Sequence, residues 1–439
     1  PGGAHVSMLA PLHGLLQRPL ASYHLLLASS GLLLAIGLTM VFSATSVHAY
    51  ATDGNAFAAL AEQATYAVIG LVAFWVCQRL PVRTYRALAA PLLAVTLGLQ
   101  GMIAAITLLH SAGLVAAPRL GPVEADSQWL YVAGISVQPS ELAKLALVLW
   151  AADVVARKGE RLGWWPELVR PLFPVAAVLL LLVGYQDLGT MLVLLVLLVG
   201  LLWTAGVRIR VFVTLALLSL PALWLLVLLQ GERRLARLTS FLDPDCNVLY
   251  ECYQATQGRT ALAEGGWFGV GLGNASHKWG WLPEGHNDFI FAVIGEELGV
   301  VGCLVVLGLF AVLVYTALRI ARRVDDRFRQ LAAGGVGIWL LAQSVINVGG
   351  VVGLLPITGL PLPFISDGGS ALVVTLAAVG MLASFARAEP DAARALHARP
   401  SPGWVRLLWA PLPPLPASGR SRAQRAGRPE SSTAAGERS

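Results

Sequence analysis

The stretch of this 439-residue chain with the clearest chemical content runs from Pro283 to Gly299 and reads PEGHNDFIFAVIGEELG. It places Glu284, His286 and Asp288 just before a long apolar segment. Ionisable side chains are costly inside a membrane and usually mark function there. Asp288 stands where the polar loop meets the apolar segment. At the water boundary, its carboxylate is the acid of this stretch best placed for chemistry.

Two further acids, Glu296 and Glu297, lie inside the helix expected after Asp288. At 1.5 Å per residue, Glu296 is about 12 Å deeper than Asp288 and turned about 80° around the helix from it. Glu297 points to the opposite side. We therefore expect the two glutamates to hold neighbouring helices rather than to act with Asp288.

A second charged motif lies between Gln138 and Leu145, which reads QPSELAKL. Proline at the first helical position and Glu141 in the first turn are typical of a helix start. Glu141 and Lys144 are three residues apart and share one face of that helix. They form either an ion pair within the helix or, with Ser140, part of a substrate site in which Lys144 binds a phosphate group.

The segment from Tyr185 to Thr190 reads YQDLGT. Asp187 precedes the next helix and Thr190 follows three residues later, a spacing that a helix N-cap alone explains. The motif is expected on the same outer face as Glu141 and Asp288. That position leaves a substrate or metal role for Asp187 open.

Two glycine-rich or proline-rich stretches complete the motifs. Residues 264–278 read EGGWFGVGLGNASHK, and their glycines let the backbone turn tightly and approach a ligand. Asn274 and Lys278 are the candidate substrate contacts of this stretch. An ordered loop without a ligand is the alternative. Residues 347–370 read NVGGVVGLLPITGLPLPFISDGGS. Irregular backbone at membrane depth is tolerated only against protein or a wet cavity. This stretch is therefore either the wall of a cavity, with Ser366, Gly368 and Gly369 at the substrate, or a simple connector.

The composition defines the class of protein. Hydrophobic residues make up 56% of the chain, charged residues only 13%, and the mean hydropathy is +0.69. A soluble chain carries about a quarter charged residues, so the sequence indicates a polytopic membrane protein. The net charge of +6 fits loops that face the cytoplasm and does not by itself indicate a nucleic-acid partner.

Ten apolar runs are long enough to span a bilayer, which predicts an all-α fold of about ten transmembrane helices. Basic residues cluster in alternate loops, whereas residues 44–64, 184–187 and 355–367 contain no Lys or Arg. By the positive-inside rule, both termini are cytoplasmic and the long loop 230–286, between the seventh and eighth helices, faces the exterior with Asp288. The runs centre on 22–43, 65–80, 87–109, 140–156, 171–185, 188–206, 209–229, 287–318, 331–354 and 368–386.

The chain divides into a transmembrane domain over residues 1–387 and a tail over residues 388–439. The tail is rich in Pro, Ala, Ser, Gly and Arg, which predicts a disordered basic cytoplasmic segment. Cys246 and Cys252 share the exterior loop, where an oxidising compartment allows a disulfide.

Taken together, QPSELAKL, DLGT, WFGVGLGNASHK, PEGHNDFIFAVIGEELG and TGLPLPFISDGGS resemble the SEDS (shape, elongation, division and sporulation) family of bacterial membrane proteins. The GLGNASHK run is similar to the division (FtsW) branch. The resemblance implies a peptidoglycan glycosyltransferase that polymerises lipid II on the outer face of the plasma membrane. It also implies a single-pass class B penicillin-binding transpeptidase and division or elongation proteins as partners, and it places the catalytic aspartate on Asp288.

The chain departs from the pattern of this family at three positions. Trp129 is a candidate substrate contact. Gln128 precedes it where the family commonly has arginine, so a cation that could have met the pyrophosphate is missing. Gln186 replaces a proline before DLGT, and Asp367 replaces the aromatic residue of the usual SYGGS. Asp367 adds negative charge at the outer boundary.

In such a reaction a sugar hydroxyl attacks an anomeric carbon and a pyrophosphate leaves. The hydroxyl must lose its proton, and a carboxylate such as Asp288 is a suitable general base. The leaving group needs Lys, Arg or a divalent cation such as Mg²⁺ or Mn²⁺. Lys144 and Lys278 are the candidate cations, and no metal-ligand set can be named from the motifs. A lipid-precursor flippase or transporter with a proton relay, and a scaffold of the division machinery, are the alternatives.

Overall fold

The computed structural model describes residues 14, 17–114, 119–120, 123–126, 128–132, 135–158, 165–229 and 252–416. Each of the ten apolar runs coincides with one long helix, so the expected all-α polytopic fold is confirmed. Six of these helices are long and apolar enough to cross a membrane, and shorter apolar helices join them. The ten are α2 (Ala21–Asp53), α3 (Ala58–Arg79), α4 (Val82–Ser111), α5 (Pro139–Lys158), α6 (Trp165–Gln186), α7 (Leu188–Thr204), α8 (Ile209–Leu229), α11 (Ile290–Arg323), α12 (Arg327–Val351) and α13 (Gly369–Arg387).

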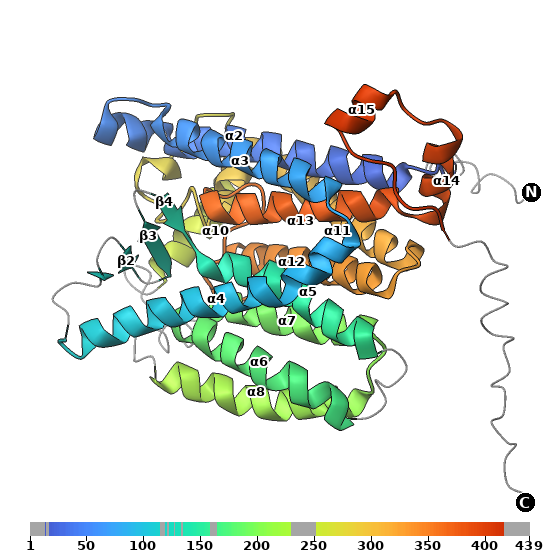
Figure 1. The fold of residues 1–439 in the computed structure, drawn as a ribbon. Coiled ribbons are helices and arrows are strands. Elements are labelled where there is room, and N and C mark those ends of the chain that lie inside the picture. The colour runs from blue at the N-terminus through green and yellow to red at the C-terminus, as the bar shows by residue number, and fades with distance from the viewer. Residues whose placement is uncertain are drawn as a thin grey trace, which may run out of the picture.

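The long helices run roughly side by side as one bundle (Figure 1). Helices α2, α3 and α13 lie along one side and α4, α6 and α8 along the other, with α12 between them. α12 contacts α5, α7 and α11. Its most apolar stretch is 78% buried, against 22% for α3, so polar side chains of α12 are directed at other protein elements rather than at lipid.

A small antiparallel sheet between α4 and α5 was not expected from the sequence. Its strands, in the order β1-β2-β3-β4, are only two to four residues long, too short to give a clear alternating pattern. Leu130 in β3 packs against Ile103 and Ile106 of α4. The strands are β1 (Arg119–Leu120), β2 (Val123–Asp126), β3 (Trp129–Val132) and β4 (Ile135–Val137).

The expected exterior loop before α11 contains structure of its own. Its described part holds α10 (Tyr253–Gly265) and a 3-10 helix at His277–Trp279. α10 and the sheet lie at one end of the bundle (Figure 1). Cys252 is disulfide-bonded, and Cys246, with which a pair was predicted, lies outside the described residues together with the rest of 230–251.

The glycine-rich segment of this loop packs against a break in α11. Gly299 has φ 67° and ψ −167°, which interrupts the helix. The freed carbonyls of Glu296 and Glu297 accept the N–H groups of Val270 and Gly271 at 2.9 and 3.0 Å. A side chain at Gly269 would meet the Glu297 carbonyl at 2.1 Å. The glycines therefore allow close approach to a helix, which matches the ordered-loop alternative.

The prediction of a disordered tail from residue 388 is wrong for residues 388–416. Helices α14 (Pro390–Ala398) and α15 (Gly403–Leu408) lie at the end of the bundle opposite α10 (Figure 1). The Trp409 indole donates to the Tyr23 hydroxyl at 2.5 Å, and Gln78 donates to the Trp409 carbonyl at 3.2 Å. These contacts of Trp409 hold the segment against α2 and α3, although its sequence shows little apolar periodicity. Residues 417–439 lie outside the described part.

Candidate active site

Asp288 lies in the turn immediately before α11 and is half-buried. The turn is closed by Glu284, which has φ 55° and whose carbonyl accepts the N–H groups of Asn287 and Phe289 at 3.1 Å. Gly359 faces the carboxylate: a Cβ at this position would lie 3.4 Å from Asp288 Oδ2, and its φ of +69° favours glycine. The candidate base is thus held between α11 and the loop 355–367.

Three successive main-chain carbonyls fix the segment that carries Asp288. The carbonyl of His286 accepts the N–H of Asp367 at 3.1 Å, and the carbonyl of Asn287 accepts the Ser366 hydroxyl at 2.7 Å. The carbonyl of Asp288 accepts the Asn347 side-chain amide at 2.8 Å. The proline-rich loop, residues 355–367, is therefore built onto the turn that carries Asp288, and its residues 357–360 line a small pocket together with Asp288.

Two amide side chains of α12 hold the proline-rich loop. Asn347 also donates to the Leu360 carbonyl at 2.6 Å, and Gln343, one turn earlier, donates to the Pro361 carbonyl at 2.7 Å. The motifs did not point to either residue as part of the site. The sequence does contain a sign of their role, because two amide side chains four residues apart share one face of a largely apolar helix.

Lys144 is joined to this arrangement from α5. Its ammonium group is fully buried, 2.7 Å from Glu141 Oε1 and 2.8 Å from Gln343 Oε1, above the ring of Trp339. Glu141 and the neighbouring Ser140 are buried as well. The structure thus contains the ion pair that was one of the two alternatives for this motif. It does not bring Lys144 to a cavity surface.

Asp187 is the N-cap of α7. Its carboxylate accepts the Thr190 N–H at 3.0 Å and the Thr190 hydroxyl at 2.5 Å, as the capping alternative predicted. Asp187 is 5% exposed, and the start of α7 packs against the proline-rich loop at Gly189 and Thr358. By capping α7, Asp187 stabilises the start of the helix that packs against this loop.

A larger cavity of about 700 Å³ opens beside the turn. Glu284 and His286 line it from the turn, Lys278 from the 3-10 helix and Asp367 from the proline-rich loop. Burial raises the pKa of Asp367 above its usual range, a shift that the nearby His286 opposes. Residues 284–289 thus contribute to both cavities, with Asp288 in the smaller one. His48 and Glu62, which no motif suggested, also line the larger one.

The two glutamates inside α11 hold neighbouring elements, as expected. Glu297 accepts the Ser43 hydroxyl of α2 at 2.6 Å and lies 3.5 Å from Lys278 Nζ. Glu296 accepts the N–H of Ser276 at 2.6 Å. Lys278 also donates to the Gly273 carbonyl at 2.5 Å. Its side chain is only 3% exposed, so the ammonium group is held between Gly273 and Glu297 at the edge of the larger cavity.

The remaining candidate residues lie at the edges of this region. Asn274 is exposed, donates to the Val270 carbonyl at 3.3 Å and is not among the residues that line these two cavities. Trp129 is half-buried in β3. Gly368 is the N-cap of α13, and a side chain at Gly369 would lie 2.4 Å from the ring of Tyr66. Gly369 therefore serves close packing between α3 and α13.

A family model described as "Cell cycle protein", covering FtsW, RodA and SpoVE, matches residues 23–390. The chain belongs to this family. FtsW/RodA/SpoVE membership agrees with the resemblance seen in the motifs. The matched range begins in α2 and ends just after α13, so it covers all ten long helices of the bundle.

Similar proteins and structures of the FtsW/RodA/SpoVE family cover most of the chain. The chain is 42% identical over 400 residues to a probable peptidoglycan glycosyltransferase FtsW of Mycobacterium tuberculosis, covering 91% of this chain and 74% of the relative. A Coxiella burnetii protein of the same description is 36% identical over 81% of this chain and 93% of its own length.

Two solved structures share the fold. One comes from work on a peptidoglycan synthase complex that coordinates polymerization and crosslinking: its TM-score is 0.62 at 26% identity, over 82% of this chain and 96% of that one. The other is the Thermus thermophilus rod shape determining protein RodA, with a TM-score of 0.56 at 26% identity, over 83% and 96%.

Proposed function

We propose that this chain is a peptidoglycan glycosyltransferase that polymerises lipid II at the outer face of the bacterial plasma membrane. The observation that carries the proposal is the way the turn with Asp288 is held at the start of α11. The main-chain carbonyls of residues 286–288 all accept hydrogen bonds, and the turn borders two cavities, of which Asp288 lines the smaller. Membership of the FtsW/RodA/SpoVE family and relatives described as peptidoglycan glycosyltransferases support it.

The residues suggest a direct displacement. The acceptor sugar hydroxyl attacks the anomeric carbon of the donor, the bond from that carbon to the pyrophosphate oxygen breaks, and the hydroxyl proton passes to Asp288. A rigid turn suits this role because a base must be held within hydrogen-bond reach of the proton that it accepts. The larger cavity, on the other side of the same turn, is the candidate site for the pyrophosphate or the sugars.

Lys278 is the proposed cation for the pyrophosphate because it borders the larger cavity. Its ammonium group is paired with Glu297 and would have to turn toward the cavity to reach a ligand. Lys144 acts in this account as the buried partner of Glu141 and Gln343 rather than as a phosphate ligand. A Mg²⁺ or Mn²⁺ ion at the pyrophosphate is compatible with the cavity, since Glu62, Glu284 and Asp367 supply carboxylate oxygens, the ligands such ions prefer. Such an ion would supply charge neutralisation of the leaving group.

The proposed partner is a single-pass class B penicillin-binding transpeptidase. The similar structure from a synthase complex that couples polymerization to crosslinking supports a partner of this kind. The FtsW-named relatives favour cell division over elongation as the setting. Alternating basic loops support an orientation with both termini in the cytoplasm, which puts α14 and α15 inside and α10 outside.

Purified protein with labelled lipid II, with and without the partner, tests the function. We expect glycan strands that appear as a ladder of products on a gel. A lipid-precursor flippase would instead move lipid II between leaflets and form no polymer even with partner and metal present. That result would contradict the proposal.

A further inference from the structure

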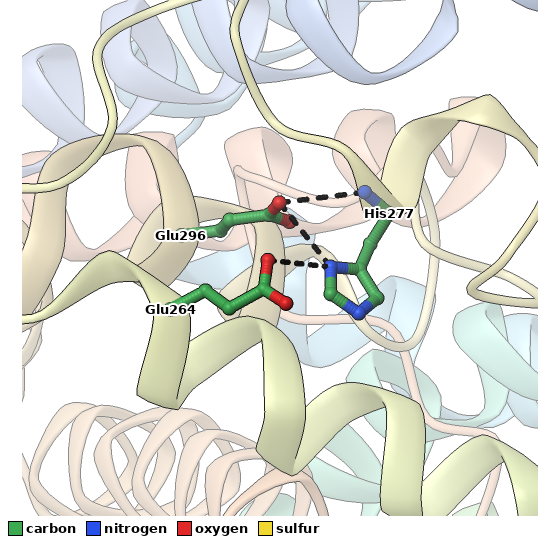
Figure 2. A group of neighbouring side chains, drawn as sticks. All are labelled: Glu264, His277 and Glu296. Atoms are coloured by element: carbon green, nitrogen blue, oxygen red, sulfur yellow. Dashed lines mark hydrogen bonds and ion pairs between the residues drawn. The ribbon is translucent and has the colours of Figure 1, made fainter.

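Glu264, His277 and Glu296 converge on one point beside the active-site region (Figure 2). They come from the end of α10, the 3-10 helix and the first part of α11. One ligand-type atom from each residue lies within 4.8 Å of the others. The mechanism above uses none of these three side chains.

The spacing of these atoms is compatible with a shared metal ion, although the shorter of the two distances is also within the range of an ordinary N–H···O hydrogen bond. His277 Nδ1 lies 3.2 Å from Glu296 Oε1 and 3.7 Å from Glu264 Oε2. Charge-assisted N–H···O bonds are about 2.7–2.9 Å long. In a tetrahedral site with ligands about 2.0–2.1 Å from the metal, neighbouring ligand atoms are about 3.3 Å apart.

Glu296 gives a second, independent indication of a cation. Its side chain is 1% exposed, and its Oε2 atom is buried without a hydrogen-bond partner among the described residues. A buried carboxylate oxygen in this state is costly unless a partner or a metal compensates it. The other oxygen is fixed by Ser276, whose N–H and hydroxyl lie at 2.6 and 3.0 Å.

Ser276 also supports the third residue. Its hydroxyl lies 3.2 Å from Glu264 Oε2, so one side chain contacts both carboxylates. Contacts of this kind around metal ligands fix their orientation. Glu264 is 48% exposed, which gives an ion a path from solvent.

We propose that Glu264, His277 and Glu296 bind a divalent transition metal, with Zn²⁺ as the ion that matches this ligand set best. One imidazole nitrogen and two carboxylate oxygens suit Zn²⁺, whereas Mg²⁺ prefers oxygen ligands alone. Three protein ligands leave a fourth position for water. The proposed role of the ion is structural, because it would join α10, through Glu264, to α11, through Glu296. Two of its ligands, His277 and Glu296, directly precede the paired residues Lys278 and Glu297.

Metal content and metal-dependent stability of the full-length protein in detergent test this site. After incubation with Zn²⁺ and removal of the excess, we expect one bound Zn²⁺ per chain and a thermal midpoint that rises with Zn²⁺ concentration. Glu264→Gln, at a half-exposed position, should weaken Zn²⁺ binding by at least about 10-fold, the scale of even an outer-shell loss. The matched control is Asp391→Asn, an exposed acid of α14 that should bind Zn²⁺ as wild type does.

X-ray absorption at the Zn edge adds a direct signature. The wild type should show a nitrogen and oxygen shell at about 2.0–2.1 Å with imidazole scattering that His277→Gln removes. If His277→Gln does not fold, Glu264→Gln decides. Substoichiometric Zn²⁺ in the wild type, or equal Zn²⁺ affinity of Glu264→Gln and Asp391→Asn, would overturn the proposal. Neither readout depends on glycan synthesis.

Discussion

The side-chain amide of Asn347 donates both to the main-chain carbonyl of Asp288, at 2.8 Å, and to that of Leu360, at 2.6 Å. One residue of α12 thereby joins the turn that carries the candidate base to the loop that covers it. Because α12 is the most buried of the six long apolar spans, this contact rests on a rigid part of the bundle.

Asn347→Leu should therefore reduce catalysis more than binding. Loss of the amide frees two buried carbonyls and lets Asp288 shift, and a misplacement of about 1 Å can cost about 10²-fold in rate. Steady-state polymerisation kinetics should show a lower kcat with little change in KM for lipid II. The matched control is Ser344→Ala, on the same helix, whose buried hydroxyl has no hydrogen-bond partner among the described residues. Equal kcat for the two variants would remove Asn347 from the positioning role.

Lys144 and Glu141 permit a test of charge pairing against phosphate binding. Lys144→Met alone leaves a buried carboxylate without its partner, which should destabilise the protein by about 3–5 kcal/mol. Lys144→Met combined with Glu141→Gln removes both charges and should recover much of that loss in thermal unfolding. The double variant should also retain most of its polymerising activity. A well-folded double variant without activity would contradict a purely structural role for this pair and favour contact of Lys144 or Glu141 with the substrate.

Ten long apolar runs dominate the sequence and predict the helices, and the residue types around Asp288 single out its turn. For Lys144 the sequence allows either a phosphate contact or an ion pair. That choice depends on Gln343, which is distant in sequence and reaches Lys144 only after α5 and α12 pack. The sheet and the ordered segment 388–416 were missed because short strands and isolated aromatic anchors carry little periodic signal.

The orientation of the bundle can be measured with single cysteines in a protein without the free Cys77 and Cys303. Phe268 is 83% exposed near α10, and Leu407 is 72% exposed in α15. An impermeant maleimide added to intact spheroplasts should label Phe268→Cys. Leu407→Cys should react only after lysis. The reverse pattern would invert the topology and place the candidate site in the cytoplasm.

Asp367 should make stability depend on pH in a defined direction. Burial raises its pKa in the folded state, so the folded protein holds the proton more tightly than the unfolded chain does. The resulting stability is fully present below the unfolded-state pKa and is lost as pH rises through the folded-state pKa. Asp367→Asn should therefore raise the thermal midpoint at neutral pH and change it little at acidic pH. A lower midpoint at neutral pH would contradict the assignment.

The most direct test of the central claim is lipid II polymerisation by Asp288→Asn. The variant keeps the shape and the hydrogen-bonding capacity of the side chain but cannot accept a proton at neutral pH. Loss of a general base typically costs about 10² to 10⁴ in rate. Asp391→Asn is the matched control, because it makes the same chemical change at an exposed acid of α14. The account predicts an Asp288→Asn protein that folds and binds lipid II and its partner yet makes almost no glycan, whereas near-normal glycan synthesis by that folded variant would contradict it.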